Sequence, residues 1–409
     1  MASRKDDKGY VLWKGESKRK DGYYIYQYKD ITGRRRVVYA KDLPALRKKE
    51  KEIIKDLSDG IDTYASENTT LNMAFERCMM GKTNNLKEST CQFYQYIYDL
   101  IIRKELGQRK VKTIKYSELK AFYLSLLVSG KLNICTVSSV HTILHATFKM
   151  LIRDEIIRVN PADDVLAEIK KSGRWKMNER HALTVDQQRI FLQYIHDDPI
   201  FSHWYPLFAF FLSTGCRAAE ALAICWSDID FTKKEIQIRR NLLYRKRPSG
   251  EYGFYITTPK TKKSKREIPM IDKLEQILRE EYERQKQDGF CKAVVDGKKG
   301  FVFMNRNGGV FRSETINSAI RRIYRAYNKE ETLKAMEEHR EPILLPHFSC
   351  HHLRHTFCTR FCENETNIKV IQAVMGHANI ETTMDIYAEV TDMKKTEAIE
   401  KLSHNLNIF

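Results

Sequence analysis

Residues 350–358 read CHHLRHTFC. The apolar side chains of this stretch and of the turn behind it recur at helical spacing, which predicts a helix that buries one stripe: Leu353, Phe357 and Phe361. His351 and Arg354 stand three residues apart, so an imidazole and a guanidinium project in the same direction from the flank of that stripe. Taken alone, such a pair is ordinarily structural, and its meaning depends on the rest of the chain.

A zinc site is an alternative interpretation of the same stretch, because His351 and His355 lie four residues apart on one helical face. However, Arg354 would sit beside the cation, the glutamate of an H-E-x-x-H motif is missing, and the cysteines follow no C-x-x-C spacing. We therefore predict that this helix binds no metal.

Two further segments carry side chains that could do chemistry. Arg217 follows Thr214-Gly215-Cys216 at the expected start of a helix, where a guanidinium beside free backbone amides outlines a phosphate site. Gly376 and His377 end a short apolar helix, and Tyr387 lies ten residues after the histidine. Each of these residues is weak evidence of a functional site by itself. The order of Arg217, His377 and Tyr387 in the chain, together with their chemistry, is stronger evidence.

The charge of the chain points to a polyanionic partner. Its 409 residues hold 71 Lys and Arg against 53 Asp and Glu, a formal net charge of +18. Two segments carry nearly all of the excess, since residues 1–50 are net +8 and residues 233–267 are net +9. Such local patches suit surfaces that face phosphate, although a single basic run is commonly only a solvated face.

Several classes of protein are excluded or disfavoured. No apolar run approaches the roughly 18 residues that a membrane span needs, and the charged start of the chain is not a secretory signal. The nine scattered cysteines do not form a disulfide framework, so we expect a reducing cytoplasm. There is also no Walker loop, no dinucleotide fingerprint and no G-x-S-x-G elbow.

Periodicity predicts a small basic sheet at the start of the chain. Tyr24, Tyr26 and Tyr28 alternate, a turn follows at residues 30–33, and a second strand begins with three arginines at residues 34–36. A charged helix is expected after the sheet, from Leu43 to Leu57. The tyrosines suit a sheet laid on DNA, but a ladder that stabilises a tiny core is equally ordinary, and both interpretations stay open.

The middle of the chain is predicted to be a helical domain that ends near Asn160-Pro161, and residues 170–174 are predicted to be a linker. A capping box at residues 184–187 starts a new domain. In that domain we expect a three-stranded sheet edge between Ile236 and the second basic run, and helices from Glu314 onward.

Five motifs in this order resemble the pattern of the tyrosine recombinase family: Thr214-Gly215-Cys216-Arg217 with Glu220, Pro259-Lys260-Thr261, His351-x-x-Arg354, Gly376-His377, and Thr382 to Tyr387. The chain is similar throughout to integrases of conjugative transposons and temperate phages. Many members have Leu where Cys216 stands and place the tyrosine nine residues after the histidine, but neither departure removes a reactive group.

The resemblance implies an α+β, mostly α fold with three domains and a tail. Residues 1–60 would be an arm-type DNA-binding domain with a three-stranded sheet and a helix, and residues 67–165 a helical core-binding domain. Residues 180–395 would be a mixed α/β catalytic domain, and residues 396–409 a tail helix. That tail would dock on a neighbouring protomer or, alternatively, pack on its own domain.

The implied activity is site-specific recombination that integrates and excises a mobile element through a 3′-phosphotyrosyl intermediate and a Holliday junction. Tyr387 would be the nucleophile, and Arg217 and Arg354 would clamp the phosphate. His351 and His377 would donate hydrogen bonds to it or assist the movement of protons. Lys260 would be the general acid, although a one-turn slip to Lys262, Lys263 or Lys265 is an alternative. Neither a metal nor another cofactor is expected.

The implied partners are double-stranded DNA at core-type and arm-type sites, three further protomers in a tetramer on DNA, and an accessory excision or host DNA-bending protein. The free protein would be a monomer, without a membrane association, in a bacterial cytoplasm at the nucleoid. We predict DNA contacts from the basic patches: Lys18, Arg19, Lys20, Arg34, Arg35, Arg36, Lys262, Lys263, Lys265 and Arg266. The rival interpretations are a type IB topoisomerase-like relaxing enzyme and a DNA-binding regulator that does not cut.

Overall fold

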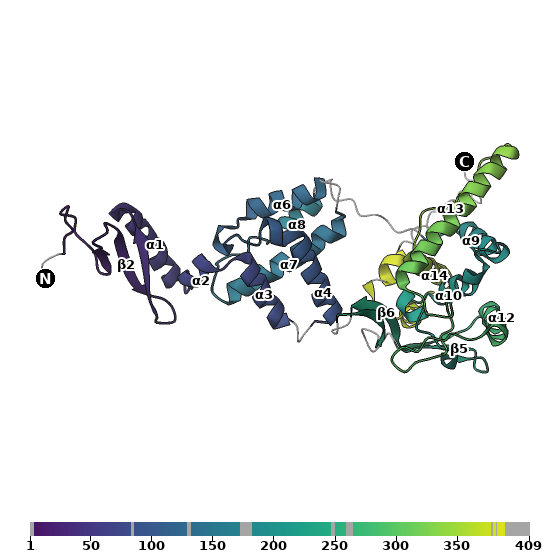
Figure 1. Cartoon of the computed structure of the whole chain (residues 1–409). Helices are drawn as coiled ribbons and strands as arrows, with labels where there is room; N and C mark the ends of the chain where they lie inside the picture. The colour runs from purple at the N-terminus through teal and green to yellow at the C-terminus, as the bar shows by residue number, and fades with distance from the viewer. Residues whose placement is uncertain are drawn as a thin grey trace. The chain divides into compact units, whose positions relative to one another are not determined.

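The computed structural model describes residues 4–82, 86–128, 132–171, 182–246, 250–258, 265–377, 379–381 and 383–388. They belong to two compact units, residues 1–178 and 179–409, which we describe separately (Figure 1). The expected fold class is confirmed, because the chain is mostly helical and has a small sheet near its start. None of the helices in the described ranges is long and apolar enough to cross a membrane.

The first unit begins with the predicted three-stranded antiparallel sheet, in the order β1 (Glu16–Lys18), β2 (Tyr24–Lys29) and β3 (Arg35–Ala40). Helix α1 (Leu43–Ser58) begins after Asp42, whose side chain accepts a hydrogen bond from the amide of Ala45. Leu46 and Ile53 of α1 pack with Tyr24 and Tyr26 in one small core. The core interpretation of these two tyrosines is therefore correct, and α1 belongs to the sheet domain.

The rest of the first unit is a helical body with a separate core. Its elements are α2 (Thr63–Asn68), α3 (Leu71–Lys82), α4 (Glu88–Ile97), the π-helical turn η1 (Tyr98–Ile102), α5 (Arg103–Glu105), the 3-10 turn η2 (Val111–Thr113), α6 (Tyr116–Val128), α7 (Ile134–Arg153) and α8 (Val165–Lys171). At the centre of this body, Phe75 of α3 stacks on Tyr98 with ring centroids 3.7 Å apart.

The predicted end of this helical body near Asn160-Pro161 was wrong. The Asn160 side chain accepts a hydrogen bond from the amide of Ala162, which makes a local turn, and the chain then continues into α8. Val165 and Ile169 of α8 are buried in the same core as α3 and α7. Lys170 and Lys171 therefore belong to this helix and not to a linker.

The second unit is built mainly of helices around an aromatic core that includes Phe208, Phe210 and Phe211. Its helices are α9 (Val185–Asp197), α10 (Tyr205–Thr214), α11 (Ala218–Ala221), α12 (Asp272–Asp288), α13 (Ser313–Glu337), α14 (Cys350–Asn364) and α15 (Ile368–Met375), with 3-10 turns η3 (Ser202–Trp204) and η4 (Trp226–Asp228). The predicted capping box at Thr184 and Gln187 is present at the start of α9. The sequence interpretation had missed α12.

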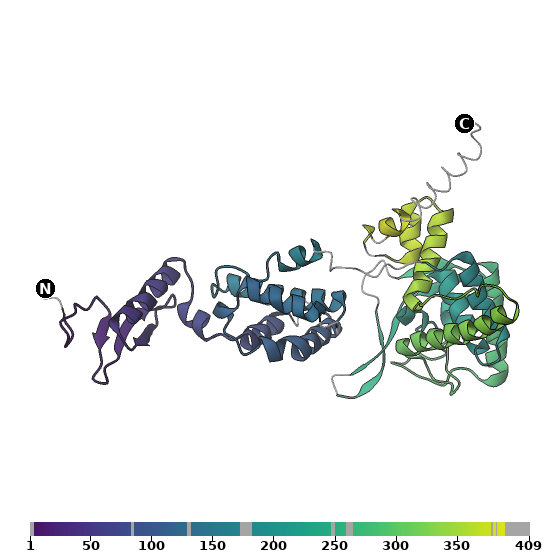
Figure 2. The same cartoon turned by 90° about the horizontal axis from the view of Figure 1, so that it is seen from above.

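The strands of the second unit pair differently from the prediction. A three-stranded sheet has the order β4 (Ile229–Asp230), β5 (Glu235–Ile238), β8 (Arg266–Pro269). A separate hairpin of β6 (Asn241–Lys246) and β7 (Tyr252–Thr257) extends away from the helices of this unit (Figure 2). The chain leaves the sheet after β5. At this point Nη2 of Arg240 donates a hydrogen bond to Oδ1 of Asp228 at 2.6 Å.

Candidate active site

Helix α15 ends at Gly376, whose φ of +62° is the left-handed conformation that glycine adopts most easily. Each of three consecutive carbonyl oxygens at this end accepts a hydrogen bond from a different arginine: Val374 from Arg266 at 2.7 Å, Met375 from Arg354 at 2.7 Å and Gly376 from Arg217 at 3.3 Å. The carbonyl end of a helix carries partial negative charge and has no partners within the helix. The three arginines therefore supply the hydrogen-bond donors that this helix end needs. We call Arg217, Arg266 and Arg354 the arginine cluster.

One buried carboxylate holds two members of this cluster. Glu220 of α11 accepts hydrogen bonds from Nη1 of Arg217 at 2.8 Å and from Nη2 of Arg266 at 3.0 Å. Burial raises the pKa of the Glu220 carboxyl, but Arg266 and Arg217 outweigh it and bring that pKa below its usual value. Glu220 is thus ionised at neutral pH and fixes both guanidinium groups.

The structure corrects the expected helix-terminus phosphate site at Arg217. Helix α11 has only the four residues Ala218–Ala221, and the amide of Arg217 donates to the carboxylate of Glu220 at 3.1 Å. The positive charge at this point therefore comes from the guanidinium of Arg217 rather than from a helix start.

Arg354 is more buried than its place on the flank of a stripe predicted. Only 4% of the residue is exposed, and its guanidinium also donates to the carbonyl oxygen of Gly215. Burial, and then the charge of Arg217, lower the pKa of Arg354 to about 10. The Arg354 guanidinium stays charged at neutral pH. The carbonyl oxygens of Gly215 and Met375 that accept its hydrogen bonds carry only partial negative charge, so a bound anion would stabilise it further.

The close approach of Gly215 to α14 depends on the absence of a side chain. Gly215 ends α10 with φ +60°, and a Cβ atom on it would lie 2.4 Å from Cδ1 of Phe357. The glycine therefore allows α10 to place its last carbonyl oxygen against Arg354.

A hollow of about 330 Å³ collects three of the residues predicted for the site. Arg217, His351 and Arg354 line it together with polar side chains that include Ser349 and Asn317. The i, i+3 spacing on α14 thus brings the imidazole and the guanidinium to one hollow, as predicted, and Arg217 joins them from a segment more than a hundred residues earlier.

His377 follows the helix end directly and is buried. Its Nδ1 lies 2.8 Å from Oγ1 of Thr383, which is also buried. Burial, and then the charges of Arg354 and Arg217, lower the pKa of His377 to about 3. The imidazole is therefore neutral at physiological pH, and it can offer hydrogen bonds but no charge.

Tyr387 lies in the helical residues 383–388, one turn after Thr383. It is partly buried and packs against a small apolar cluster formed by α14 and α15: Cys358, Cys362, Ile371 and Met375. The helix that ends in the arginine cluster thus also supports the segment of the predicted nucleophile. Lys260, Lys262, Lys263 and the tail at residues 396–409 lie outside the described residues.

The residues predicted to contact DNA differ in their exposure and in their ion pairs. Lys20, Arg34, Arg35 and Lys265 are exposed, and Arg19 is exposed beside Asp21 at 3.2 Å. Lys18 pairs with Asp7, and Arg36 is held by Asp30 at 2.8 Å and stacks 3.8 Å from the ring centre of Tyr64. The side chain of Arg266 is only 5% exposed, which argues against the predicted DNA contact for this residue.

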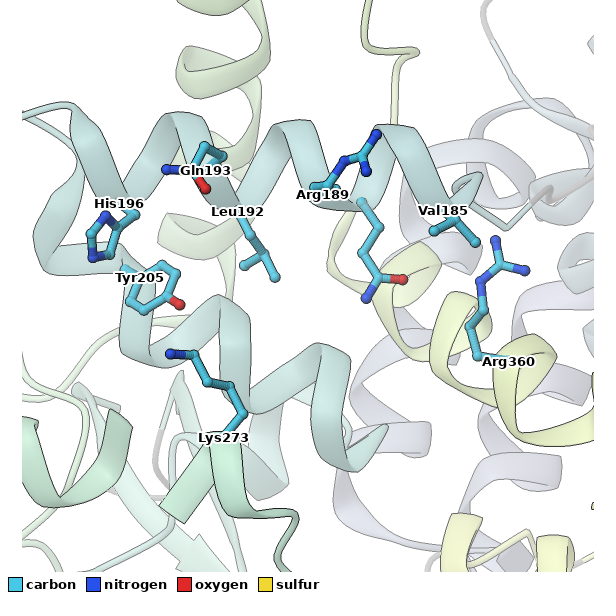
Figure 3. A pocket seen from close by; sticks show the side chains of 9 residues that line it. Val185, Arg189, Leu192, Gln193, His196, Tyr205, Lys273 and Arg360 are labelled. Atoms are coloured by element: carbon cyan, nitrogen blue, oxygen red, sulfur yellow. The ribbon is translucent and has the colours of Figure 1, made fainter. Parts of the chain in front are cut away.

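Another hollow of the second unit does not coincide with the predicted site. A space of about 540 Å³ lies along α9, where Leu192 and Tyr205 form part of the wall between the basic side chains of Arg189 and Lys273 (Figure 3). None of the predicted catalytic residues lines it. Within the described ranges, moreover, no three His, Cys, Asp or Glu side chains gather as a metal site would require.

Sequence reasoning missed the roles of three residues. In the sequence, Glu220 stands out only as part of a motif, although its position three residues after Arg217 is the spacing of a helical ion pair. Arg266 looks like one more cation of the basic run around it. Thr383 had no local signal, because its partner His377 lies six residues away across a turn.

Comparison with known proteins gives matches over nearly the whole chain. The phage integrase family matches residues 181–394, and the DNA binding domain of Tn916 integrase matches residues 1–57. The transposase of transposon Tn916 from Enterococcus faecalis is 30% identical over 401 residues, which cover 95% of this chain and 94% of the relative. The Tn1545 transposase of Streptococcus pneumoniae matches with the same identity and coverage.

Solved structures agree with these matches. A variant of the Tn1549 transposon integrase in complex with transposon right end DNA has a TM-score of 0.69 and 27% identity, and the match covers 82% of this chain and 100% of that one. A lambda integrase dimer bound to a COC′ core site has a TM-score of 0.54 at 16% identity over 94% of this chain and 96% of that one, and at this identity it supports the fold alone.

The neutral state of His377 predicts a pH effect on stability. The unfolded histidine takes up a proton below about pH 6.5, whereas the folded one does so only near pH 3, so the free energy of unfolding falls as the pH falls between these values. His377→Gln removes this contribution, which amounts to at most about 1.4 kcal/mol per pH unit for one proton. In urea unfolding between pH 7.5 and 5, the variant should therefore lose less stability than the wild type. Equal pH slopes for the two proteins would contradict the buried neutral imidazole.

Proposed function

The chain belongs to the phage integrase family, and we propose that it is the integrase that inserts a conjugative transposon, or a related mobile element, into DNA and excises it again. It is a site-specific tyrosine recombinase that acts on DNA. The observation that carries the proposal is the meeting of Arg217, His351 and Arg354 at one hollow, beside the helix end that leads to His377 and Tyr387.

The reaction begins with the hydroxyl of Tyr387, which attacks the scissile phosphorus. A bond forms between the phenolic oxygen and phosphorus, the bond to the 5′ oxygen breaks, and the phenolic proton passes to the surrounding water. The product is a 3′-phosphotyrosyl DNA end and a free 5′ hydroxyl. Because a protonated phenol is a weak nucleophile, the site has to hold it in line with the leaving oxygen and to stabilise the charge of the transition state.

The arginine cluster supplies that charge. The three guanidinium groups and the carboxylate of Glu220, which is hydrogen-bonded to Arg217 and Arg266, carry a net charge of +2. A phosphodiester brings one negative charge, and a second develops as the phosphorane forms. Arg217 and Arg354, which line the hollow, are the members placed to bind the non-bridging oxygens. Two fixed cations of this kind can do what Mg²⁺ does at other phosphoryl-transfer sites, so we expect activity in EDTA.

The two histidines act on the same phosphate as hydrogen-bond donors. His377 is neutral, and when Thr383 donates to its Nδ1, the proton of the ring is on Nε2 and is available to a phosphate oxygen. His351 lines the hollow beside Arg354. Neither group is needed as a cation, because the arginine cluster already provides the charge.

Lys260 is the proposed general acid for the 5′ oxygen. It precedes β8 by a few residues in the sequence, and Arg266 at the start of β8 is a member of the arginine cluster that Glu220 holds. A proton from the lysine to the leaving oxygen balances the proton that the tyrosine loses. Rejoining reverses these steps with a 5′ hydroxyl of another strand, and the phosphotyrosyl bond conserves the energy of the phosphodiester. No nucleotide is consumed, which agrees with the missing phosphate loop in the sequence.

We also propose that residues 1–60 bind arm-type sites and that the helical body, extended to Lys171, binds core-type sites. The match of residues 1–57 to an integrase DNA-binding domain supports this division and disfavours a type IB topoisomerase, which has no use for an arm domain. The open face of the sheet carries exposed Lys29 and Arg35, paired in register, and it is the face opposite α1. Strand exchange by a tetramer, with an accessory or DNA-bending protein, at the nucleoid of a bacterial cytoplasm completes the proposal.

The nucleophile can be tested by covalent trapping on nicked DNA that carries the ends of the element, in EDTA. The wild type should form a protein–DNA adduct that denaturing gels retain, and Tyr387→Phe should form none while it binds the same DNA. Tyr282→Phe on α12 is the matched control and should trap normally. An adduct with Tyr387→Phe would assign the nucleophile to another residue. Tight binding without an adduct by either protein would favour the regulator.

The general acid can be tested with a 5′-phosphorothiolate at the scissile position, whose sulfur leaves without protonation. Lys260→Ala should cleave the ordinary phosphodiester at least tenfold more slowly than the wild type and should recover most of that loss on the sulfur substrate. Lys273→Ala, at an exposed residue of α12, is the control and should show no such selective recovery. If Lys262→Ala, Lys263→Ala or Lys265→Ala recovers in place of Lys260→Ala, that lysine is the general acid.

A further inference from the structure

Arg266 is unlike the other cations of its basic run. It is the first residue of β8, where it lies opposite Ile238 of β5, and its side chain is 5% exposed. Lys265, the residue before it, is exposed. A buried guanidinium is costly unless it is hydrogen-bonded and paired, so this side chain has a specific place in the fold.

Its contacts join three elements of the site. Nε donates to the carbonyl oxygen of Val374 at the end of α15, and Nη2 donates to Oε2 of Glu220 on α11 at 3.0 Å. Nη2 also lies 3.8 Å from Sγ of Cys216. A Cβ atom on Gly376 would be 2.9 Å from Nη1 of Arg266, so the glycine that ends α15 also makes room for this arginine.

Arg266 does not line the hollow of about 330 Å³. The hollow is lined by Arg217, His351 and Arg354, whereas Arg266 borders a different depression beside Arg239 and Lys265. It therefore does not reach the phosphate that Arg217 and Arg354 would bind. Its influence on that phosphate passes through Glu220, because the other oxygen of this carboxylate holds Nη1 of Arg217.

We propose that Arg266 is a positioning residue for the recombination reaction. It keeps Glu220 in the form that holds Arg217 towards the phosphate, and it ties β8, the strand that follows Lys260 in the sequence, to the end of α15. This inference rests on the proposed function. Without Arg266, buried Glu220 keeps Arg217 as its hydrogen-bonded cation and the more distant charge of Arg354, and it takes up a proton at a higher pH than before. Protonated Glu220 no longer fixes Arg217, so the rate of cleavage falls as the pH falls.

The test compares Arg266→Met with Arg266→Lys in the full chain, on nicked DNA at saturating concentration, between pH 5.5 and pH 9. Arg266→Met should cleave at least tenfold more slowly than the wild type at pH 7, and it should recover part of the rate as the pH rises. Arg266→Lys keeps a cation near Glu220 and should be intermediate, with a pH profile closer to that of the wild type. The dissociation constant for DNA should change by less than about twofold in both.

Glu220→Gln identifies the route of the effect. Combined with Arg266→Met, it removes the group that titrates, so the acidic limb of the rate profile should disappear while the rate stays low. Lys265→Met is the matched surface control, and it should weaken DNA binding without a new acidic limb. If Arg266→Met does not fold, Arg266→Gln, which is also uncharged but polar, makes the same comparison with and without Glu220→Gln.

Two results would overturn the inference. A loss of DNA affinity with an unchanged rate at saturation would make Arg266 a DNA contact. An equal loss of rate at every pH, with no gain from lysine, would make it a merely structural residue. Both are distinct from failure of the proposed function, in which the wild type itself would form no covalent adduct.

Discussion

The last carbonyl groups of a helix need hydrogen-bond donors, and α15 finds them in three arginines from three other segments. Arg217 precedes α11, Arg354 belongs to α14, and Arg266 begins β8, yet all three end on consecutive carbonyl oxygens. One buried carboxylate, Glu220, locks two of them. Contacts within the chain therefore hold the cations together, and a phosphodiester brings negative charge that balances the positive charge of the cluster.

The same helix end organises the other reactive groups. The left-handed turn at Gly376 places His377 beside the cluster, whose charge helps to keep the imidazole neutral. His377 contacts Thr383, and Tyr387 follows one turn later on a segment that packs against α14 and α15. A single feature of the backbone thus connects the phosphate-binding groups with the segment that carries the nucleophile.

Sequence patterns were sufficient for most helices, because their apolar spacing is local, and for the order of the five motifs. They were not sufficient for contacts between distant segments. The pairing of β5 with β8 skips a hairpin, and carbonyl groups that hold Arg217 and Arg354 belong to residues far along the chain, which no local spacing encodes. Arg266 looked like its basic neighbours because burial is a property of the fold. Helix α8 was not predicted because local sequence was misleading there. The turn at Asn160 is a strong local signal for the end of a domain, but further core residues follow it.

The arginine cluster is proposed to balance the charge that develops on the scissile phosphate. Replacing that phosphate with a neutral methylphosphonate, and comparing cleavage by the wild type with cleavage by Arg217→Ala, tests this role. The variant should be nearly inactive on the phosphate and should regain at least tenfold on the methylphosphonate, because one negative charge no longer needs a cation. If the wild type cleaves both substrates and the variant gains nothing on the neutral one, the cluster does not act through charge.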